Sequence, residues 1–360
     1  MKLILIQDCL SPHINELLSA FEKKGISVDY YCISNEFSGE KFEKTPYSIY
    51  LYKETLDLKL ILKLINNNKK IVVTGFMNIN TIILNIIFFI LRKKYFYYTD
   101  MPISISKSSL FSKIKRSLSH LLIKYSRANI ICVGKPAIKY FENQKFKNRL
   151  INLPMIASVN TTYLERASKF KWRYEKLGIE SNKVLVTAGS RLEHIKGFDI
   201  LINAVSKIEY KYRKLIKIVI YGDGSYKDKL YNLVKKKDLL EQFIFLGWIS
   251  SNLMNNYIQM SDLYVHPSRY DAYGPSYIPL SMGVSVIGSN KAGVIIDRII
   301  NGHNGFIYTY NDTNQLSEKI KYFIINQKKI DEYGKNAYED SKKNFSSDAI
   351  VNKFKQQLWA

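Results

Sequence analysis

The stretch KVLVTAGSRLEHIKGFDILINA, residues 183–204, contains the unit from which the fold can be worked out. Its first six residues form an apolar run typical of a buried strand, and its last seven form an apolar segment typical of a helix. A loop with two cations, Arg191 and Lys196, lies between them and is flanked by Gly189 and Gly197. A strand that leads through a short loop into a helix is the repeating unit of a parallel α/β sheet.

The same unit recurs in two series along the 360 residues. The strands expected are 2–6, 28–33, 70–75, 95–99, 129–134 and 149–153 in the first series, and 183–188, 216–222, 243–247, 262–267, 284–289 and 305–308 in the second. A charged, irregular stretch near 155–180 separates the two series. We therefore predict two Rossmann-like, doubly wound α/β domains that face an interdomain cleft, with ligands bound beyond the carboxyl ends of the strands.

The composition indicates a globular protein of a reducing compartment. Hydrophobic residues make up 46% of the chain, which is enough for a large core. Three widely spaced cysteines, Cys9, Cys32 and Cys132, fit neither a disulfide framework nor a zinc site. The first residues, MKLILIQDCL, lack the long apolar core and the cleavage site of a signal peptide. We expect a cytoplasmic protein.

Positive charge is concentrated in one part of the chain. The net charge is +23, and residues 51–150 alone hold 19 Lys and Arg against 4 Asp and Glu, a surplus of +15. Nucleic acid, an anionic membrane surface and a phosphorylated substrate all suit such a field. A gene rich in A and T would also raise the lysine content, although everywhere in the chain. No helix-turn-helix, zinc-finger or RNP-like signature is present, so we expect no binding to nucleic acid.

Two segments of this basic region bear on membrane binding. Residues 71–91 contain no charged side chain, yet they include Asn78, Asn80 and Asn85, and we expect a buried strand followed by an apolar helix rather than a helix at the membrane surface. Residues 109–127 predict a basic amphipathic helix. Its apolar side chains are Leu110, Phe111, Ile114, Leu118, Leu121, Leu122 and Tyr125, and its basic ones are Lys113, Lys115, Arg116, Lys124 and Arg127. Both attachment to an anionic membrane and packing of the apolar face on the sheet fit this pattern.

The loop that follows residues 183–188 has the physics of anion capture. It is neither a P-loop nor a dinucleotide-binding fingerprint. A strand ends there, glycine allows close approach of the backbone, the next helix presents free N–H groups, and two cations flank the site.

The segments that follow this loop carry a family resemblance. They are YGDGSYKDKL (221–230), FIFLGWIS (243–250), SDLYVHPSRYDAYGPSYIPLSMGVSVIGS (261–289) and NGHNGFIY (301–308). In this order and spacing they resemble the carboxyl-terminal half of the group 1, retaining, nucleotide-sugar-dependent glycosyltransferases of the GT-B fold. The first half is similar, more weakly, to the acceptor domain of members that assemble bacterial polysaccharides.

The resemblance implies a role for each matched residue. Arg191 and Lys196 would hold the donor diphosphate and stabilise the charge that accumulates as the sugar leaves, without a metal. Asp271 would bind hydroxyls of the donor sugar, and the backbone after Gly274 would approach sugar and phosphate. The other donor-binding residues expected are Gly189, Ser190, Tyr273, Pro275, Ser276, Gly222 and Trp248.

The sequence departs from the family pattern at three points. Asp271 stands where glutamate is usual, and Pro275 removes one backbone N–H. The second carboxylate of the family, which holds the ribose, is replaced by Pro279, or by Ile278 when the count runs back from Gly283. Ribose recognition is therefore expected to differ, and a catalytically silent sugar-nucleotide or glycan-binding subunit is the alternative interpretation.

Other polar residues are more ambiguous. His13 follows the first strand and is a candidate for the catalytic cleft or a helix-start residue. Asp100 ends the strand 95–99 and would orient or deprotonate the acceptor hydroxyl, or cap a turn. His266 is expected to pack inside the second sheet, and His194 to be exposed.

Together these observations predict a metal-independent retaining enzyme. It would transfer a sugar from a nucleoside diphosphate sugar to a growing, lipid-linked bacterial surface glycan, such as an O-antigen or a capsule. We expect an acceptor-binding domain at 1–160, a donor-binding domain at 161–345, and a helix at 346–360 that packs back on the first domain. The protein would be cytoplasmic and peripheral on the inner face of the membrane, where an anionic surface and a diphosphate lipid suit its basic first domain.

Overall fold

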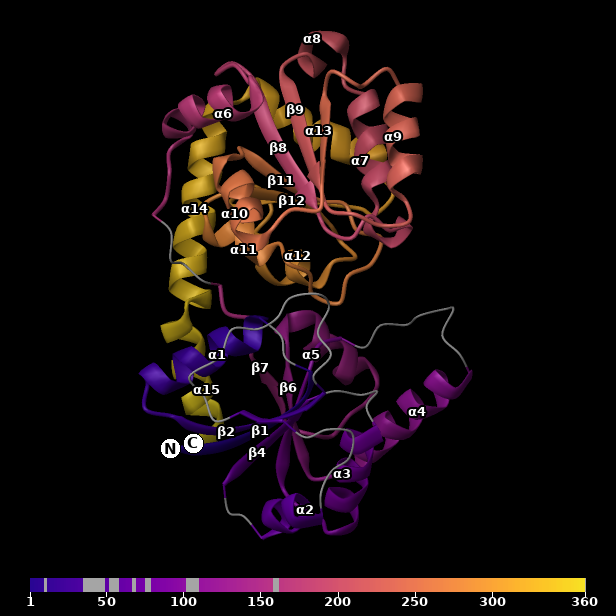
Figure 1. Cartoon of the computed structure of the whole chain (residues 1–360), viewed down its shortest axis with the longest axis vertical. Coiled ribbons are helices and arrows are strands. Elements are labelled where there is room, and N and C mark those ends of the chain that lie inside the picture. The colour runs from indigo at the N-terminus through magenta and orange to yellow at the C-terminus, as the bar shows by residue number, and fades with distance from the viewer. Residues whose placement is uncertain are drawn as a thin grey trace. The chain divides into compact units, whose positions relative to one another are not determined.

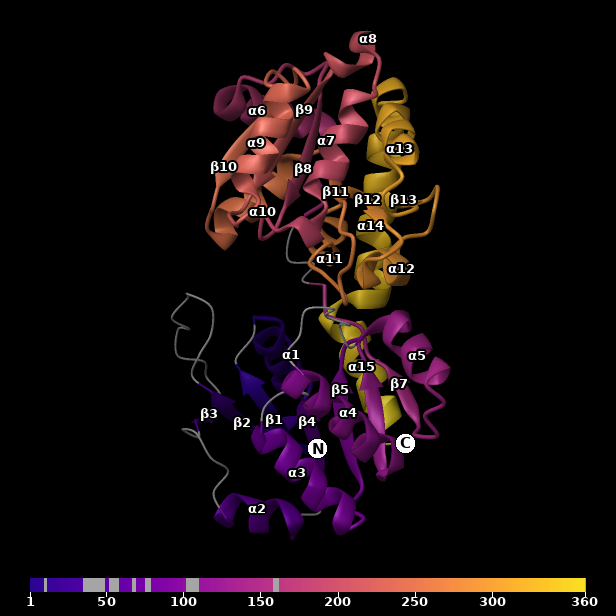
Figure 2. The same ribbon diagram turned by 90° about the vertical axis from the view of Figure 1, so that its right-hand side faces the viewer.

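The computed structural model describes residues 1–9, 12–34, 49–51, 58–66, 69–74, 79–101, 110–157 and 162–359. The chain divides into two compact units: Met1–Ile156 with Ser347–Ala360, and Ala157–Ser346. Each unit has one parallel sheet with helices on its faces (Figure 1, Figure 2). The predicted α/β class with two doubly wound domains is confirmed.

The sheet of the first unit has seven strands in the order β3-β2-β1-β4-β5-β6-β7. Their bounds are β1 (Lys2–Cys9), β2 (Ser27–Ser34), β3 (Ile49–Leu51), β4 (Lys70–Thr74), β5 (Tyr95–Thr99), β6 (Ala128–Cys132) and β7 (Leu150–Asn152). All strands predicted in this half are present. The edge strand β3 was not predicted from the sequence.

The helices of this unit include one from the far end of the chain. They are α1 (Pro12–Lys23), α2 (Leu58–Ile65), α3 (Ile79–Ile90), α4 (Leu110–Tyr125), α5 (Gly134–Asn143) and α15 (Ser347–Trp359). Helix α15 packs against α1, where the ring centroids of Phe21 and Phe354 lie 4.7 Å apart. The carboxyl terminus therefore contributes to the hydrophobic core of the first unit.

The apolar segment 71–91 contains the expected strand and helix. Within α3 the polar side chains of Asn80 and Asn85 are buried, and Asn85 accepts a hydrogen bond of 2.7 Å from the Tyr95 hydroxyl. The outer side of α3 is instead apolar, with Ile83, Phe89 and Ile90 exposed. None of the helices within the described ranges is long and apolar enough to cross a bilayer.

Helix α4 packs on the unit through a small face and turns apolar side chains outward. Ser119 and Ile123 are buried, whereas four residues that recur at helical spacing are exposed: Ile114, Leu118, Leu121 and Tyr125. Helix α4 also contacts α3. The interpretation that this helix packs through its whole predicted apolar face is therefore wrong for these four side chains; those of residues 110–113, 115 and 116 lie outside the described part.

The second unit has a six-stranded sheet in the order β10-β9-β8-β11-β12-β13. Its strands are β8 (Val184–Gly189), β9 (Ile216–Tyr221), β10 (Phe243–Gly247), β11 (Leu263–His266), β12 (Ser285–Ser289) and β13 (Gly305–Tyr308). This is the 3-2-1-4-5-6 order of a Rossmann sheet, whose direction of winding reverses between the first and fourth strands. Here those strands are β8 and β11, which lie side by side.

Helices surround this second sheet. They are α6 (Phe170–Leu177), α7 (Phe198–Ser206), α8 (Tyr210–Arg213), α9 (Lys227–Lys236), α10 (Ser251–Met260), α11 (Tyr277–Ser281), α12 (Gly293–Arg298), α13 (Thr313–Ile325) and α14 (Lys328–Phe345), with 3-10 turns η1 (Arg166–Lys169) and η2 (His194–Lys196). Helices α9 and α13 each pack against α7, and α11 packs against α14 (Figure 2).

The stretch near 155–180 is not irregular as predicted, because it holds η1 and α6. Its two arginines are buried against a single carboxylate. Asp262 accepts hydrogen bonds from Arg166 at 3.0 Å and from both terminal nitrogens of Arg173 at 2.8 Å. Lys169 donates to the carbonyl oxygen of Ser261 at 3.0 Å. In the sequence this stretch resembles a solvated charged segment, but its buried cations anchor it to the sheet next to β11.

Candidate functional site

The strongest candidate site lies where the winding of the second sheet reverses. Strands β8 and β11 are parallel neighbours, so the loops after Gly189 and His266 leave the sheet from the same edge. Ligands of open α/β sheets bind at such an edge, in the crevice outside the strand ends. Most of the residues predicted to bind the donor follow these strands, while Gly222 and Trp248 follow β9 and β10.

The first loop is held by backbone contacts with the loop after β9. The Leu192 amide donates to the Asp223 carbonyl oxygen at 2.8 Å. Gly222 has φ +115°, and a Cβ there would lie 1.9 Å from the carbonyl oxygen of Ser190. Only glycine fits, so the packing of these loops accounts for Gly222. Within the first loop the Arg191 side chain is exposed.

The turn that carries Lys196 rests on the backbone after β11. Gly197 has φ +70°, and a Cβ there would lie 2.1 Å from the carbonyl oxygen of Pro267. Arg269 fixes the same turn, donating to the His194 carbonyl oxygen at 2.8 Å and to the Asp199 carboxylate at 2.8 and 2.6 Å. No local sequence pattern indicates this arginine–aspartate pair, because its partners are 70 positions apart.

Lys196 and Asp271 meet at this edge. The Lys196 ammonium lies 2.6 Å from Oδ2 of Asp271, and both side chains are mostly buried, at 15% and 13% exposed. Nε2 of His266 lies 3.4 Å from the same oxygen. Burial alone would raise the pKa of the Asp271 carboxyl, but His266 and Lys196 together lower this pKa to about 2. The carboxylate is therefore ionised at neutral pH.

The backbone around Asp271 is fastened to the start of α12. The Gly293 amide donates to the Asp271 carbonyl oxygen at 3.0 Å. A Cβ on Gly293 would lie 2.0 Å from the carbonyl oxygen of Ala272, so the approach of the two segments requires glycine. These contacts fix the position of the carboxylate.

The segment after Asp271 alternates between the interior and the surface. Tyr273 is buried, and its hydroxyl donates to Asp297 at 2.8 Å and accepts from Arg298 at 2.9 Å. Ser276 is also buried, while Gly274 is half-buried and Pro275 exposed. The side chains of Tyr273 and Ser276 therefore make contacts inside the protein, and the backbone at 274–275 is the part of this segment that a ligand can contact.

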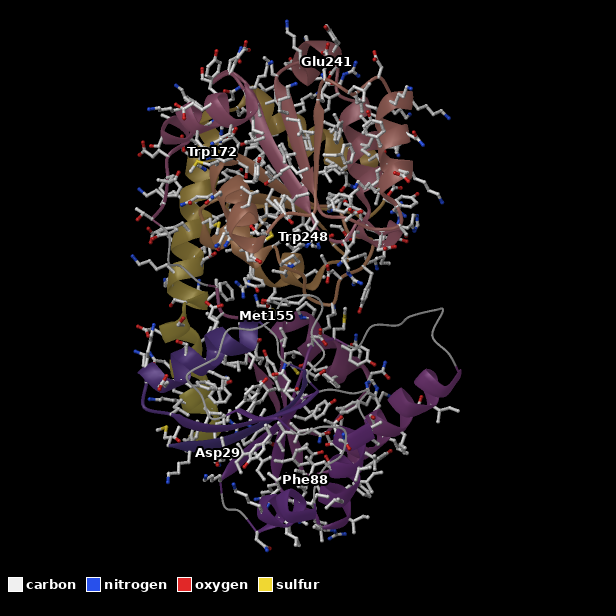
Figure 3. All side chains as sticks on the ribbon, viewed as in Figure 1. Asp29, Phe88, Met155, Trp172, Glu241 and Trp248 are labelled. Atoms are coloured by element: carbon white, nitrogen blue, oxygen red, sulfur yellow. The ribbon has the colours of Figure 1, made fainter. Side chains whose placement is uncertain are left out.

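Two further positions singled out in the sequence lie after β10 and in α11. Trp248 follows β10 and is 69% exposed, at the opposite end of the strand from Glu241 (Figure 3). Pro279 is buried within the short helix α11, so it offers no acceptor for a ribose hydroxyl, and neither does the apolar Ile278 beside it.

The candidates in the first unit are only partly described. His13 lies in the first turn of α1, and its side chain is outside the described part of the structure. Asp100 directly follows β5 and is half-buried. Their roles stay predictions.

The sequence interpretation missed His266 as a site residue. It is 4% exposed, as expected for a residue that packs inside the sheet. However, it ends β11 and its ring reaches Asp271, so it belongs to the same cluster as Lys196. Its place in HPSRYD, five positions before Asp271, was the available signal.

Comparison with known proteins shows what the second unit resembles. Residues 171–340 match the family model of glycosyl transferases group 1, and this range contains Arg191, Lys196 and Asp271. Over this range the second unit is similar to the glycosyl transferases group 1. The solved structure of HepE of Anabaena in complex with UDP is similar to the whole chain, with a TM-score of 0.76 and 17% identity over 100% of both chains. That likeness shows the GT-B fold.

Curated relatives align over a part of the chain. An uncharacterised glycosyltransferase of Methanocaldococcus jannaschii is 29% identical over 148 residues, 41% of this chain and 40% of its own length. The poly(ribitol-phosphate) alpha-N-acetylglucosaminyltransferase of Staphylococcus aureus is 28% identical over 167 residues, 46% of this chain and 33% of its own. The chain thus spans less than half the length of either relative.

Proposed function

We propose that the protein transfers a sugar, with retention, from a nucleoside diphosphate sugar to a growing glycan at the membrane surface. The observation that carries the proposal is the meeting of Lys196 and Asp271 at the switch point of the second unit, which matches the group 1 glycosyltransferase model over residues 171–340. A cation and a carboxylate at this edge suit the two ends of a nucleotide sugar, the diphosphate and the sugar hydroxyls. The similar Anabaena protein binds UDP, which supports this class of donor.

The electrostatics of the site fit departure of a diphosphate. Lys196 is mostly buried, so its charge acts in a region where water screens little. As the bond to the sugar breaks, negative charge builds up on the diphosphate, and a fixed cation stabilises this transition state more than the ground state. Arg191, on the same loop, would add a second, exposed charge. In this proposal the protein supplies the cations and the reaction needs no divalent metal.

The acceptor side of the proposal rests on the first unit. Residues 51–150 carry the surplus of +15, and α3 and α4 expose Ile83, Ile90, Leu118 and Leu121. An apolar surface within a basic region suits the plane of an anionic bilayer, where apolar side chains enter the headgroup boundary and cations meet lipid phosphates. We propose peripheral attachment there and a lipid-linked glycan as acceptor, with the first unit binding the acceptor and the second the donor.

The direct test of the donor assignment is a binding screen of the purified chain against UDP-, GDP-, ADP- and dTDP-sugars, read as thermal shifts. We expect sugars of one of these nucleoside diphosphates to stabilise the wild-type protein and to lose this effect in Lys196→Ala. A matched control is Lys235→Ala, which removes an exposed lysine from α9. Stabilisation by none of the donors would contradict the proposal.

A catalytically silent binding subunit is the second candidate, and Pro279 is the observation that favours it. Without the second carboxylate the ribose is held differently, and binding without transfer is its expected consequence. Donor binding in the screen with no release of nucleoside diphosphate would favour this candidate over the enzyme.

A further inference from the structure

We propose that His266 is a positioning residue for Asp271. Its imidazole donates a hydrogen bond to the carboxylate when the diphosphate of a donor draws Lys196 away. The inference rests on the proposed function, because it requires a diphosphate beside Lys196. It assigns a role in the site to a buried histidine.

The first argument is competition for one oxygen. Oδ2 of Asp271 lies 2.6 Å from the Lys196 ammonium and 3.4 Å from Nε2 of His266. In the structure the Lys196 ammonium donates to the carboxylate, and Nε2 of His266 makes no hydrogen bond within the described residues. The imidazole is thus in place beside the carboxylate, slightly beyond hydrogen-bonding distance.

The second argument is the free energy of a buried carboxylate. Asp271 is 13% exposed, so it cannot turn to bulk water when its cation leaves. A buried charge without a partner is strongly unfavourable. A diphosphate that attracts Lys196 would create that situation unless another donor reaches Oδ2. His266 is the neighbouring group at that oxygen.

The third argument is the proton on the imidazole. The Ser276 hydroxyl lies 2.7 Å from Nδ1 of His266, and this serine is fully buried. Nε2 faces the Asp271 carboxylate, which only accepts hydrogen bonds, so the neutral tautomer with its proton on Nε2 suits this position. In that tautomer Nδ1 is an acceptor, and the Ser276 hydroxyl can donate to it.

The backbone leaves room for this contact. Gly274 has φ +89°, and a Cβ there would lie 3.0 Å from Oδ2 of Asp271 and 3.1 Å from Cε1 of His266. A larger residue would wedge between ring and carboxylate. Glycine keeps the short path open over which the two side chains can close.

A matched pair of substitutions separates positioning from packing. In His266→Asn the amide can replace Nδ1 beside Ser276, but it is too short to reach Asp271. In His266→Gln the amide can extend to the place of Nε2 and donate. We expect His266→Asn to weaken binding of the nucleoside diphosphate, among UDP, GDP, ADP and dTDP, that the wild type binds. The loss should be about tenfold to a hundredfold, as for one hydrogen bond to a charged group, and His266→Gln should recover most of it.

A double-mutant cycle gives the second readout. When Asp271→Asn has removed the carboxylate, adding His266→Asn should change the affinity little, because the charge that needed a partner is gone. Equal losses in His266→Asn and His266→Gln, or the same loss with and without the Asp271 carboxylate, would overturn the inference and leave a packing role. A wild-type chain that binds none of the four nucleotides would instead overturn the proposed function, and the inference with it.

Discussion

At the scale of single residues, the account depends on how a few side chains divide between structure and ligand. Lys196 and Asp271 are paired with each other, while Gly222, Tyr273 and Ser276 are tied to the protein itself. Residues that a family pattern groups together thus act differently here. Some present charge at the sheet edge, and others hold the loops that place this charge.

The first prediction concerns the two cations. Lys196→Ala and Arg191→Ala should each lower the rate of transfer by about 10² to 10³, the usual effect of removing one electrostatic donor to a developing charge. Initial rates at saturating donor measure this, with melting temperatures to check the fold. Near-normal turnover in either folded variant would remove that residue from the donor site.

The second prediction uses two glycines in the left-handed region. Gly178 has φ +62° with nothing within 4 Å of a Cβ, whereas a Cβ on Gly197 would lie 2.1 Å from the Pro267 oxygen. Gly178→Ala should lower the free energy of unfolding by about 1–2 kcal/mol and leave donor binding intact. Gly197→Ala should also shift the turn that carries Lys196 and weaken donor binding. Equal donor affinity in the two variants would argue against this role of the turn.

At the scale of elements, the stability of the second unit depends on a segment that looks solvated in the sequence. The turn η1 and helix α6 bring Arg166, Lys169 and Arg173 into the protein, where Asp262 accepts bonds from both arginines. This network joins residues 166–177 to the region of β11, the strand that leads to His266 and Asp271. It holds the amino-terminal end of β11, whereas the site lies at the carboxyl-terminal end of this strand.

The third prediction concerns the pH dependence of stability and rests on Lys169. Burial lowers its pKa from 10.5 to about 8, although Asp262 opposes this shift. The unfolded chain therefore binds more protons than the folded chain between these two values, and the stability of the wild type rises with pH across that window, by at most about 1.4 kcal/mol per pH unit. Lys169→Met should lack this rise.

Denaturant unfolding at several pH values between the two pKa values measures the difference. Lys171→Met is the control, because Lys171 lies on α6 with a side chain 87% exposed. Its stability should follow that of the wild type. A curve for Lys169→Met that also runs parallel to the wild type would show that Lys169 does not carry a lowered pKa.

The fourth prediction concerns the outward faces of α3 and α4. The wild-type protein should sediment with liposomes to an extent that grows with anionic lipid and falls in high salt, since each basic residue near the surface contributes about 1 kcal/mol. Neutralising Lys113, Lys115 and Arg116 together, or changing Leu118 and Leu121 together to serine, should reduce this binding.

The matched control for the leucines changes Leu240 and Ile325 of the second unit to serine, because these side chains are similarly exposed, at 50% and 52%. An equal loss in the control would mean that the binding does not depend on α4. Resistance of the wild type to extraction by salt and alkali would indicate an embedded segment rather than peripheral attachment.

At the scale of the whole molecule, the sequence predicted the sheets well. Strands of a parallel sheet are buried on both faces, so they appear as continuous apolar runs that are easy to recognise. The edge strand β3, with only three residues, Ile49–Leu51, has no such run. Helix α6 was missed because its one buried residue is Arg173 rather than an apolar side chain.

The candidate site was predictable to the extent that single loops carry it. Arg191, Lys196 and Asp271 stand in recognisable sequence patterns, but these patterns do not give the distances between the side chains. The roles of His266 and Arg269 depend on which loops meet at the junction of β8 and β11, and no local pattern reports a partner 70 positions away. The direction in which α4 faces likewise follows from packing and not from its own periodicity.

The fifth prediction is also the most direct test of the central claim, that the protein supplies the cations for departure of the diphosphate. Purified protein is incubated with UDP-, GDP-, ADP- and dTDP-sugars in a chelator, with water as acceptor, and release of nucleoside diphosphate is followed. Wild type and Lys235→Ala should release it from at least one donor without added metal, and Lys196→Ala should be slower by about 10² to 10³. Release that requires magnesium or manganese, or equal release by Lys196→Ala, would contradict the account.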